Sequence, residues 1–167
     1  MNKGTVQVFC GEGSGKTTAA IGKGVSAVGN GKSVIMIQFL KGSQITEEVD
    51  VLKRFEPDMK VFRFEKSSKC FASLNDDEKK EECVNIRNGL NFARKVLSTG
   101  ECDLLILDEV LGLVETQIVT QEELIRLIEQ KDDEMDLILT GKVFPENLYP
   151  YADNISKIDN MKVDNPF

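Results

Sequence analysis

Short apolar runs alternate with amphipathic segments along the chain. Four of the apolar runs carry no charged residue before their carboxyl ends: residues 5–9, 33–39, 104–109 and 137–140. Runs of this kind are typical of parallel strands that are covered on both faces. Residues 61–64 and 154–158 alternate apolar and polar side chains, which predicts two further strands.

Between the strands, apolar residues recur at the three- and four-residue spacing of helices. The expected helices cover residues 16–28, residues 47–55, the segment from Asn75 to Gly100 and the segment from Thr120 to Ile128. The last two begin with capping-box patterns at Asn75 and Thr120. Residues 66–74 are expected to form a loop, and the helical spacing places Cys83 in the core. This alternation predicts one α/β domain over residues 1–167, with a mostly parallel sheet and helices on both faces.

A glycine-rich segment separates the first predicted strand from the first predicted helix. Residues 11–18 read Gly-Glu-Gly-Ser-Gly-Lys-Thr-Thr. Glycines leave backbone N–H groups free to surround an anion, and the helix adds the positive end of its dipole. In such a loop Lys16 neutralises phosphate charge and Thr17 holds Mg²⁺. The strict pattern G-x-x-x-x-G-K-[ST] has Cys10 in place of its first glycine, and a turn that binds nothing is the alternative. The strand-to-helix context favours a phosphate-binding loop.

Polar residues stand where three other predicted strands end. Gln38 and Lys41 lie at the end of the second strand, and Lys142 follows the fifth. Asp108 and Glu109 end the fourth strand as the acids of a Walker B element do. The carboxyl ends of parallel strands border the ligand crevice, so these side chains are candidates for one ligand. The alternatives are a solvated lysine at position 41 and a solvated helix start for the two acids.

Composition narrows the classes of function. The formal net charge is −7 and no Lys/Arg-rich run occurs, which argues against nucleic acid as a partner. The sequence shows no apolar stretch of membrane-spanning length and no signal-peptide pattern, so we expect no membrane contact and a cytoplasmic protein. The four cysteines are far apart, without a zinc-site pattern. Because the chain has no histidine, its chemistry must use carboxylates, lysines and metal.

Several motifs together resemble one known family, the P-loop corrinoid (cob(I)alamin) adenosyltransferases. The resemblance covers nearly the whole chain and rests on residues 11–20, Gln38-Phe39-Leu40-Lys41-Gly42, Leu107-Asp108-Glu109, Leu139-Thr140-Gly141-Lys142 and Asn165-Pro166-Phe167. The family also lacks the first glycine of the strict loop pattern. The resemblance implies a P-loop NTPase-like (RecA-like) three-layer sandwich that binds ATP and Mg²⁺ (or Mn²⁺). It also implies a corrinoid substrate, a homodimer and a reductant such as a flavoprotein.

The implied reaction transfers the 5′-deoxyadenosyl group of ATP to the cobalt of a reduced corrinoid and releases triphosphate. Cobalt(I) is itself the nucleophile, so no general base is needed. By position, the resemblance implies that Lys16, Lys41 and Glu109 act in catalysis and that Thr17, Glu109 and Asp108 hold the metal. The implied ligand-binding residues are Gly11, Glu12, Gly13, Ser14, Gly15, Lys16, Thr17, Thr18, Gln38, Phe71 and Lys142.

The chain departs from the family pattern at positions linked to the corrinoid and to the phosphates. Phe71-Ala72-Ser73 replaces a Phe-x-Trp pair, and Lys142 replaces an arginine. Two alternatives therefore stay open. One is an ATP-binding protein that has lost corrinoid chemistry and has a regulatory role, and the other is a generic P-loop ATPase or kinase.

Overall fold

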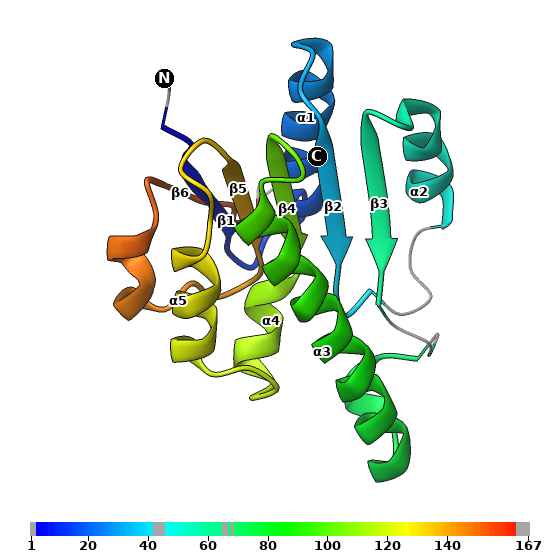
Figure 1. The fold of residues 1–167 in the computed structure, drawn as a ribbon. Helices are drawn as coiled ribbons and strands as arrows, with labels where there is room; N and C mark the ends of the chain where they lie inside the picture. Colours follow the sequence, from blue (N-terminus) through cyan, green and yellow to red (C-terminus); the bar gives the residue numbers. More distant parts are fainter. Residues whose placement is uncertain (1–2, 42–45, 65–66, 68, 163–167) are drawn as a thin grey trace, which may run out of the picture.

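A parallel sheet forms the centre of the protein (Figure 1). The computed structural model describes residues 3–41, 46–64, 67 and 69–162, and the side chains of residues 46–48 are left out of the description. The strands are β1 Val6–Cys10, β2 Val34–Gln38, β3 Met59–Arg63, β4 Leu104–Asp108, β5 Asp136–Thr140 and β6 Asn154–Lys157. Their order is β3-β2-β4-β5-β1-β6, and every neighbouring pair is parallel. Each expected strand is present, within two residues at either end.

Helices cover both faces of the sheet, which confirms the expected fold class. They are α1 Lys16–Gly29, α2 Thr46–Leu52, α3 Asp76–Thr99, α4 Val110–Glu115 and α5 Gln121–Glu129. On one face, Ile106 and its neighbours pack in a core with Ala20 of α1 and Leu52 of α2. On the other, Leu105 and Leu107 pack in a larger core with α3, α4 and α5 (Figure 1). Successive residues of β4 thus serve opposite cores, as the pleat of a strand requires.

Local capping chemistry sets the helix boundaries that the sequence predicted. The Asn75 side chain accepts a hydrogen bond from the Glu78 N–H at 2.8 Å, and the Glu78 carboxylate accepts one from the Asn75 N–H at 3.0 Å. Thr120 makes the same reciprocal pair at the start of α5. Helix α3 ends at Gly100, whose φ of 63° is a left-handed conformation that glycine adopts readily. Both capping boxes and the Gly100 stop are therefore confirmed.

The prediction for Cys83 is wrong. Cys83 is only half-buried, and the neighbouring Glu82 is buried instead, where its carboxylate accepts a hydrogen bond from the Ser67 N–H at 2.8 Å. The first turns of α3 extend past the ends of the strands, so they meet a polar segment and not the sheet (Figure 1). Of the expected loop at residues 66–74, the described part is irregular except for a short 3₁₀ helix at Phe71–Ser73, and residues 66 and 68 lie outside the described residues.

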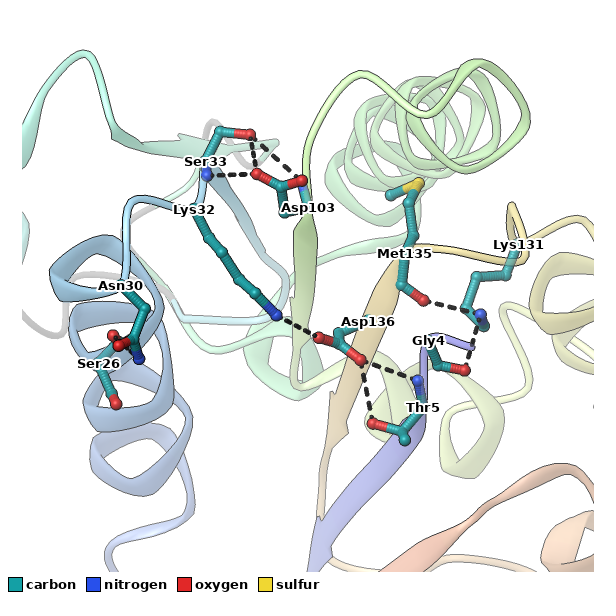
Figure 2. A network of polar contacts seen from close by, with 10 residues as sticks. All are labelled: Gly4, Thr5, Ser26, Asn30, Lys32, Ser33, Asp103, Lys131, Met135 and Asp136. Carbon is teal, nitrogen blue, oxygen red and sulfur yellow. Dashed lines mark hydrogen bonds and ion pairs between the residues drawn. The ribbon is translucent and has the colours of Figure 1, made fainter. Parts of the chain in front are cut away.

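Polar contacts fasten the amino ends of the strands, and Figure 2 shows these contacts. The glycine-rich loop follows the carboxyl end of β1, at the opposite edge of the sheet. Asp136 accepts hydrogen bonds from the Thr5 N–H and hydroxyl at 2.8 and 3.1 Å and forms an ion pair with Lys32. Asp103 accepts the N–H and hydroxyl of Ser33 at 2.7 and 3.0 Å. Burial raises the pKa of Asp136, but the bonds from Thr5 and Lys32 outweigh it, and the net pKa lies below the usual value. These contacts tie β1 to β5 and β2 to β4.

None of the helices in the described part of the chain is both long and apolar enough to cross a membrane.

Candidate nucleotide-binding site

The glycine-rich loop joins β1 to α1, as the sequence predicts, and two of its glycines have steric reasons to be glycine. Gly11 has a φ of 111°, and a Cβ there would lie 2.3 Å from the Ile158 carbonyl oxygen. A Cβ on Gly13 would lie 2.7 Å from the same oxygen. Both distances are far inside van der Waals contact, so the loop packs too closely on the segment after β6 for any side chain at these positions.

The first amides of the loop have partners within the protein. The Glu12 and Ser14 N–H groups donate to the side chains of Asp159 and Asn160, each at 3.3 Å. The Gly11 N–H donates to the Lys142 carbonyl and the Gly13 N–H to the Ile158 carbonyl, each at 2.8 Å. These bonds hold the loop on the segments that follow β5 and β6. The first N–H groups of α1 have no partner within the helix, as at any helix start, and they carry the positive end of its dipole. The start of α1 is therefore the part of the loop suited to bind phosphate.

Lys16 lies across the loop. Its side chain is buried, and its Nζ donates to the Gly13 carbonyl at 2.6 Å. The partner is neutral, so this contact leaves the charge of the ammonium uncompensated. Its role as a phosphate contact stays a prediction.

Asp108, at the end of β4, is the centre of a buried polar cluster. Its carboxylate accepts hydrogen bonds from the Thr17 hydroxyl at 3.0 and 3.2 Å, the Thr140 hydroxyl at 2.7 Å and the Gln38 side-chain amide at 3.3 Å. It also forms an ion pair with Lys41, whose Nζ lies 2.9 Å from Oδ2. Residues from α1, β2, β4, β5 and the turn after β2 thus meet on one carboxylate. The solvated-acid alternative is wrong for Asp108, which is fully buried.

Lys41 connects this cluster to the phosphate loop. Besides its ion pair, its Nζ donates to the Thr17 hydroxyl at 2.9 Å, and its side chain is only 9% exposed. The alternative of a solvated strand-end lysine is therefore wrong. Gln38 and Lys41 lie beside the loop, as the rule for strand ends predicts, and Gln38 in turn accepts a hydrogen bond from Arg63 at 2.9 Å. Their contact with a ligand stays a prediction.

Glu109 differs from Asp108 in backbone and environment. Its φ of 61° is left-handed, which is unfavourable for a residue with a side chain, and it is half-buried. Its N–H donates to the Thr140 hydroxyl at 2.8 Å. Thr140 therefore links the Asp108 carboxylate to the backbone of Glu109, a role that the sequence analysis missed. The available signal was a polar residue at the end of an apolar strand, the same signal that identified Gln38.

The side chains of the remaining candidate residues are not joined to this centre by a described contact. Phe71 is half-buried, with the Lys79 Nζ 5.9 Å from its ring centroid. The side chain of Lys142 is exposed, and only its carbonyl contacts the loop. Glu12, Ser14, Gly15 and Thr18 are exposed on the loop and on the first turn of α1.

A family model for ATP:corrinoid adenosyltransferases, BtuR/CobO/CobP, matches residues 2–165. The chain belongs to this adenosyltransferase family. A corrinoid adenosyltransferase of Escherichia coli K12 is 29% identical over 160 residues, which cover 96% of this chain and 79% of that protein. The corrinoid adenosyltransferase CobA of Salmonella typhimurium is 28% identical over the same shares of the two chains.

One solved structure extends the fold comparison beyond the adenosyltransferase family. A KaiC-like protein of Pyrococcus horikoshii aligns with a TM-score of 0.56 at 17% identity, covering 98% of this chain and 76% of that one. At this sequence identity the structural similarity shows a shared fold only, and that fold agrees with the expected RecA-like architecture.

The oxygens of this adenosyltransferase site suit a magnesium ion. Mg²⁺ prefers oxygen ligands and binds through one or two protein groups together with phosphates and water. The Thr17 hydroxyl and the Asp108 carboxylate are adjacent, and the ammonium of Lys41 contacts both. Among the described residues, no group of three or more His, Cys, Asp and Glu side chains could hold a metal by itself. The site thus fits a metal that arrives with a nucleotide.

Proposed function

We propose that this adenosyltransferase binds Mg-ATP between the phosphate loop and the Asp108 cluster and transfers the adenosyl group to a reduced corrinoid. The observation that carries the proposal is the meeting of Thr17, Lys41 and Asp108 beside the loop that holds Lys16. Two ammonium groups and the start of a helix face the place expected for the triphosphate.

Transfer of the adenosyl group requires that the departing triphosphate is stabilised. The cobalt(I) of the substrate donates an electron pair to C5′ of ATP, the C5′–O bond breaks, and its electron pair leaves with the triphosphate. Lys16 and Lys41 stabilise the oxygen that becomes negative, and the N–H groups at the start of α1 hold the phosphates in place. A bound Mg²⁺ supplies further charge compensation to the triphosphate. Protons need not move, in keeping with a chain that lacks histidine.

We also propose roles for individual residues of the site. Thr17, Asp108 and Glu109 are the proposed metal ligands. Gln38 and Lys142 are proposed near the phosphates, and Phe71 is proposed at the corrinoid side. We propose one domain, a homodimer in the cytoplasm and a flavoprotein reductant.

The products of the reaction test the proposal. The protein is incubated without oxygen with Mg-ATP and a chemically reduced corrinoid, while the corrinoid spectrum is followed and the phosphates are separated by chromatography. We expect adenosylcorrinoid and intact triphosphate. ADP and phosphate with an unchanged corrinoid spectrum would favour a P-loop ATPase or kinase. ATP binding without turnover would favour a regulatory protein.

Substitutions at the site test the roles of its residues. Lys16→Ala and Thr17→Ala should each weaken Mg-ATP binding roughly ten- to hundredfold, the effect of losing one charge-assisted contact. Glu109→Gln should reduce metal-dependent activity more than Asp108→Asn if Glu109 is the nearer metal ligand, and the reverse order would exchange their roles. Lys60→Ala, on the exposed part of β3, is the matched control and should bind Mg-ATP like the unmodified protein.

A further inference from the structure

The ammonium of Lys41 contacts the two oxygens that best suit a metal ion. Its Nζ lies 2.9 Å from the Thr17 hydroxyl oxygen and 2.9 Å from Asp108 Oδ2. A lysine ammonium has three donors and no acceptor, so it must donate to Thr17. The hydroxyl proton of Thr17 is then directed to Asp108, which completes a closed ring of three groups.

An ammonium and a divalent cation are alternatives at this position. A metal that took these oxygens as ligands would need the place that the ammonium occupies, because two cations so close together repel strongly. The lysine side chain has a flexible four-carbon stem and can turn away from the pair without a change in the backbone. In the free protein, the ammonium of Lys41 therefore weakens the binding of a metal ion in the absence of nucleotide.

The backbone beside Lys41 supports a functional reason for its position. Leu40 has a φ of 55°, in the left-handed region that is costly for a residue with a branched side chain. Such strain persists where the surroundings fix it, and it is concentrated at ligand sites and switches. The strained turn directly precedes the lysine that reaches the Asp108 cluster.

We propose that Lys41 is an internal cation that takes the place of the metal on Thr17 and Asp108 until the nucleotide binds. A divalent cation then binds tightly only with ATP, because the triphosphate offers the ammonium of Lys41 a new anionic partner. The lysine thereby links metal entry to nucleotide binding. This inference rests on the proposed function, since it concerns the same Mg-ATP site.

The test measures metal binding without nucleotide or corrinoid. The probe is Mn²⁺, and its free concentration is followed by electron paramagnetic resonance during titration into the full chain. Lys41→Met and Lys41→Gln should bind Mn²⁺ about tenfold more tightly than the unmodified protein, because they remove the competing charge. Lys60→Met removes one exposed lysine from β3 and should leave the affinity within about twofold. Circular dichroism checks that each variant is folded. If the methionine variant does not fold, the glutamine variant is measured in its place, since its amide is a neutral hydrogen-bond donor.

A second measurement, the affinity for Mg-ATP, tests whether the ammonium of Lys41 contacts the triphosphate. Both neutral variants should bind Mg-ATP about tenfold more weakly, since they lose a charged contact with the triphosphate. Mn²⁺ affinity that is unchanged or weaker in the folded variants would overturn the competition. Unchanged Mg-ATP affinity would overturn the transfer of the ammonium to the nucleotide. The Mn²⁺ titration contains neither ATP nor corrinoid, so its outcome is independent of whether the unmodified protein transfers an adenosyl group.

Discussion

Replacement of Asp108 by asparagine should destabilise the folded protein, quite apart from any effect on activity. The carboxylate is fully buried and accepts hydrogen bonds from Thr17, Gln38 and Thr140, besides its ion pair with Lys41. Asparagine keeps one oxygen but presents an NH₂ group to a set of donors, and it leaves a nearly buried ammonium without its anion. Removing one partner of a buried pair costs about 3–5 kcal/mol, and the retained oxygen reduces the cost toward about 3 kcal/mol.

The free energy of unfolding is measured by urea titration, followed by circular dichroism. For a chain of this length, about 3 kcal/mol corresponds to a fall in Tm of roughly 6–12 °C. Asp50→Asn is the control, because Asp50 forms an exposed pair with Lys53 that should contribute under about 0.5 kcal/mol. A loss below about 1 kcal/mol for Asp108→Asn would refute the account of the cluster.

The double variant Asp108→Asn/Lys41→Met separates the ion pair from the hydrogen bonds. It removes the stranded charge, so it should be more stable than Asp108→Asn alone. We expect a coupling free energy of about 2 kcal/mol, which lies within the range for residues in direct contact. Simple additivity of the two single changes would mean that the pair contributes nothing by itself.

Two further predictions concern groups outside the site. Asp136→Asn should lower the free energy of unfolding by about 1 kcal/mol at pH 7, because it weakens the bonds to Thr5 and Lys32. The folded-state pKa of Asp136 is lowered, so its stabilisation is present above the ordinary value near 4 and is lost as the pH falls through the folded-state pKa. Urea titrations from pH 7 to pH 3 should show the difference from the unmodified protein shrinking, and a constant difference would contradict this account. Burial raises the pKa of Cys102 to about 12. Alkylation by iodoacetamide at pH 8 should therefore be at least about a hundredfold slower at Cys102 than at the exposed Cys70. Mass spectrometry measures the alkylation rate at each cysteine, and comparable rates would contradict the buried position of Cys102.

The centre of the site could be predicted because two local rules apply there. One is that a glycine-rich segment between a strand and a helix indicates a phosphate loop, which located Lys16 and Thr17. The other is that polar residues at the carboxyl ends of parallel strands share one edge of the sheet, which placed Gln38 and Asp108 together. Neither rule needs knowledge of contacts between distant residues.

The features that the sequence did not predict depend on contacts between residues that are distant in the sequence. Helix α4 was missed because only Glu109 separates it from β4 and no side-chain capping bond marks its start. Helical spacing could not distinguish Cys83 from Glu82, since they lie three and four residues before the buried Ile86 and both spacings belong to one helix face. The position of Lys41 depends on a left-handed turn at Leu40, a conformation that no residue type in that segment indicates.

The charges of the site give one reason for a cation beside Asp108. A buried carboxylate near a bound triphosphate would repel it, and the repulsion would be strong because little water screens the site. In the free protein the ammonium of Lys41 balances Asp108, while the bond that Lys16 makes among the described residues is to a neutral carbonyl. A nucleotide bound as proposed would therefore meet a compensated Asp108 and the ammonium of Lys16, an arrangement that would attract the triphosphate before any metal is in place. If the metal later replaces Lys41 on Asp108, both lysines become available to the triphosphate at the moment when it must leave as an anion.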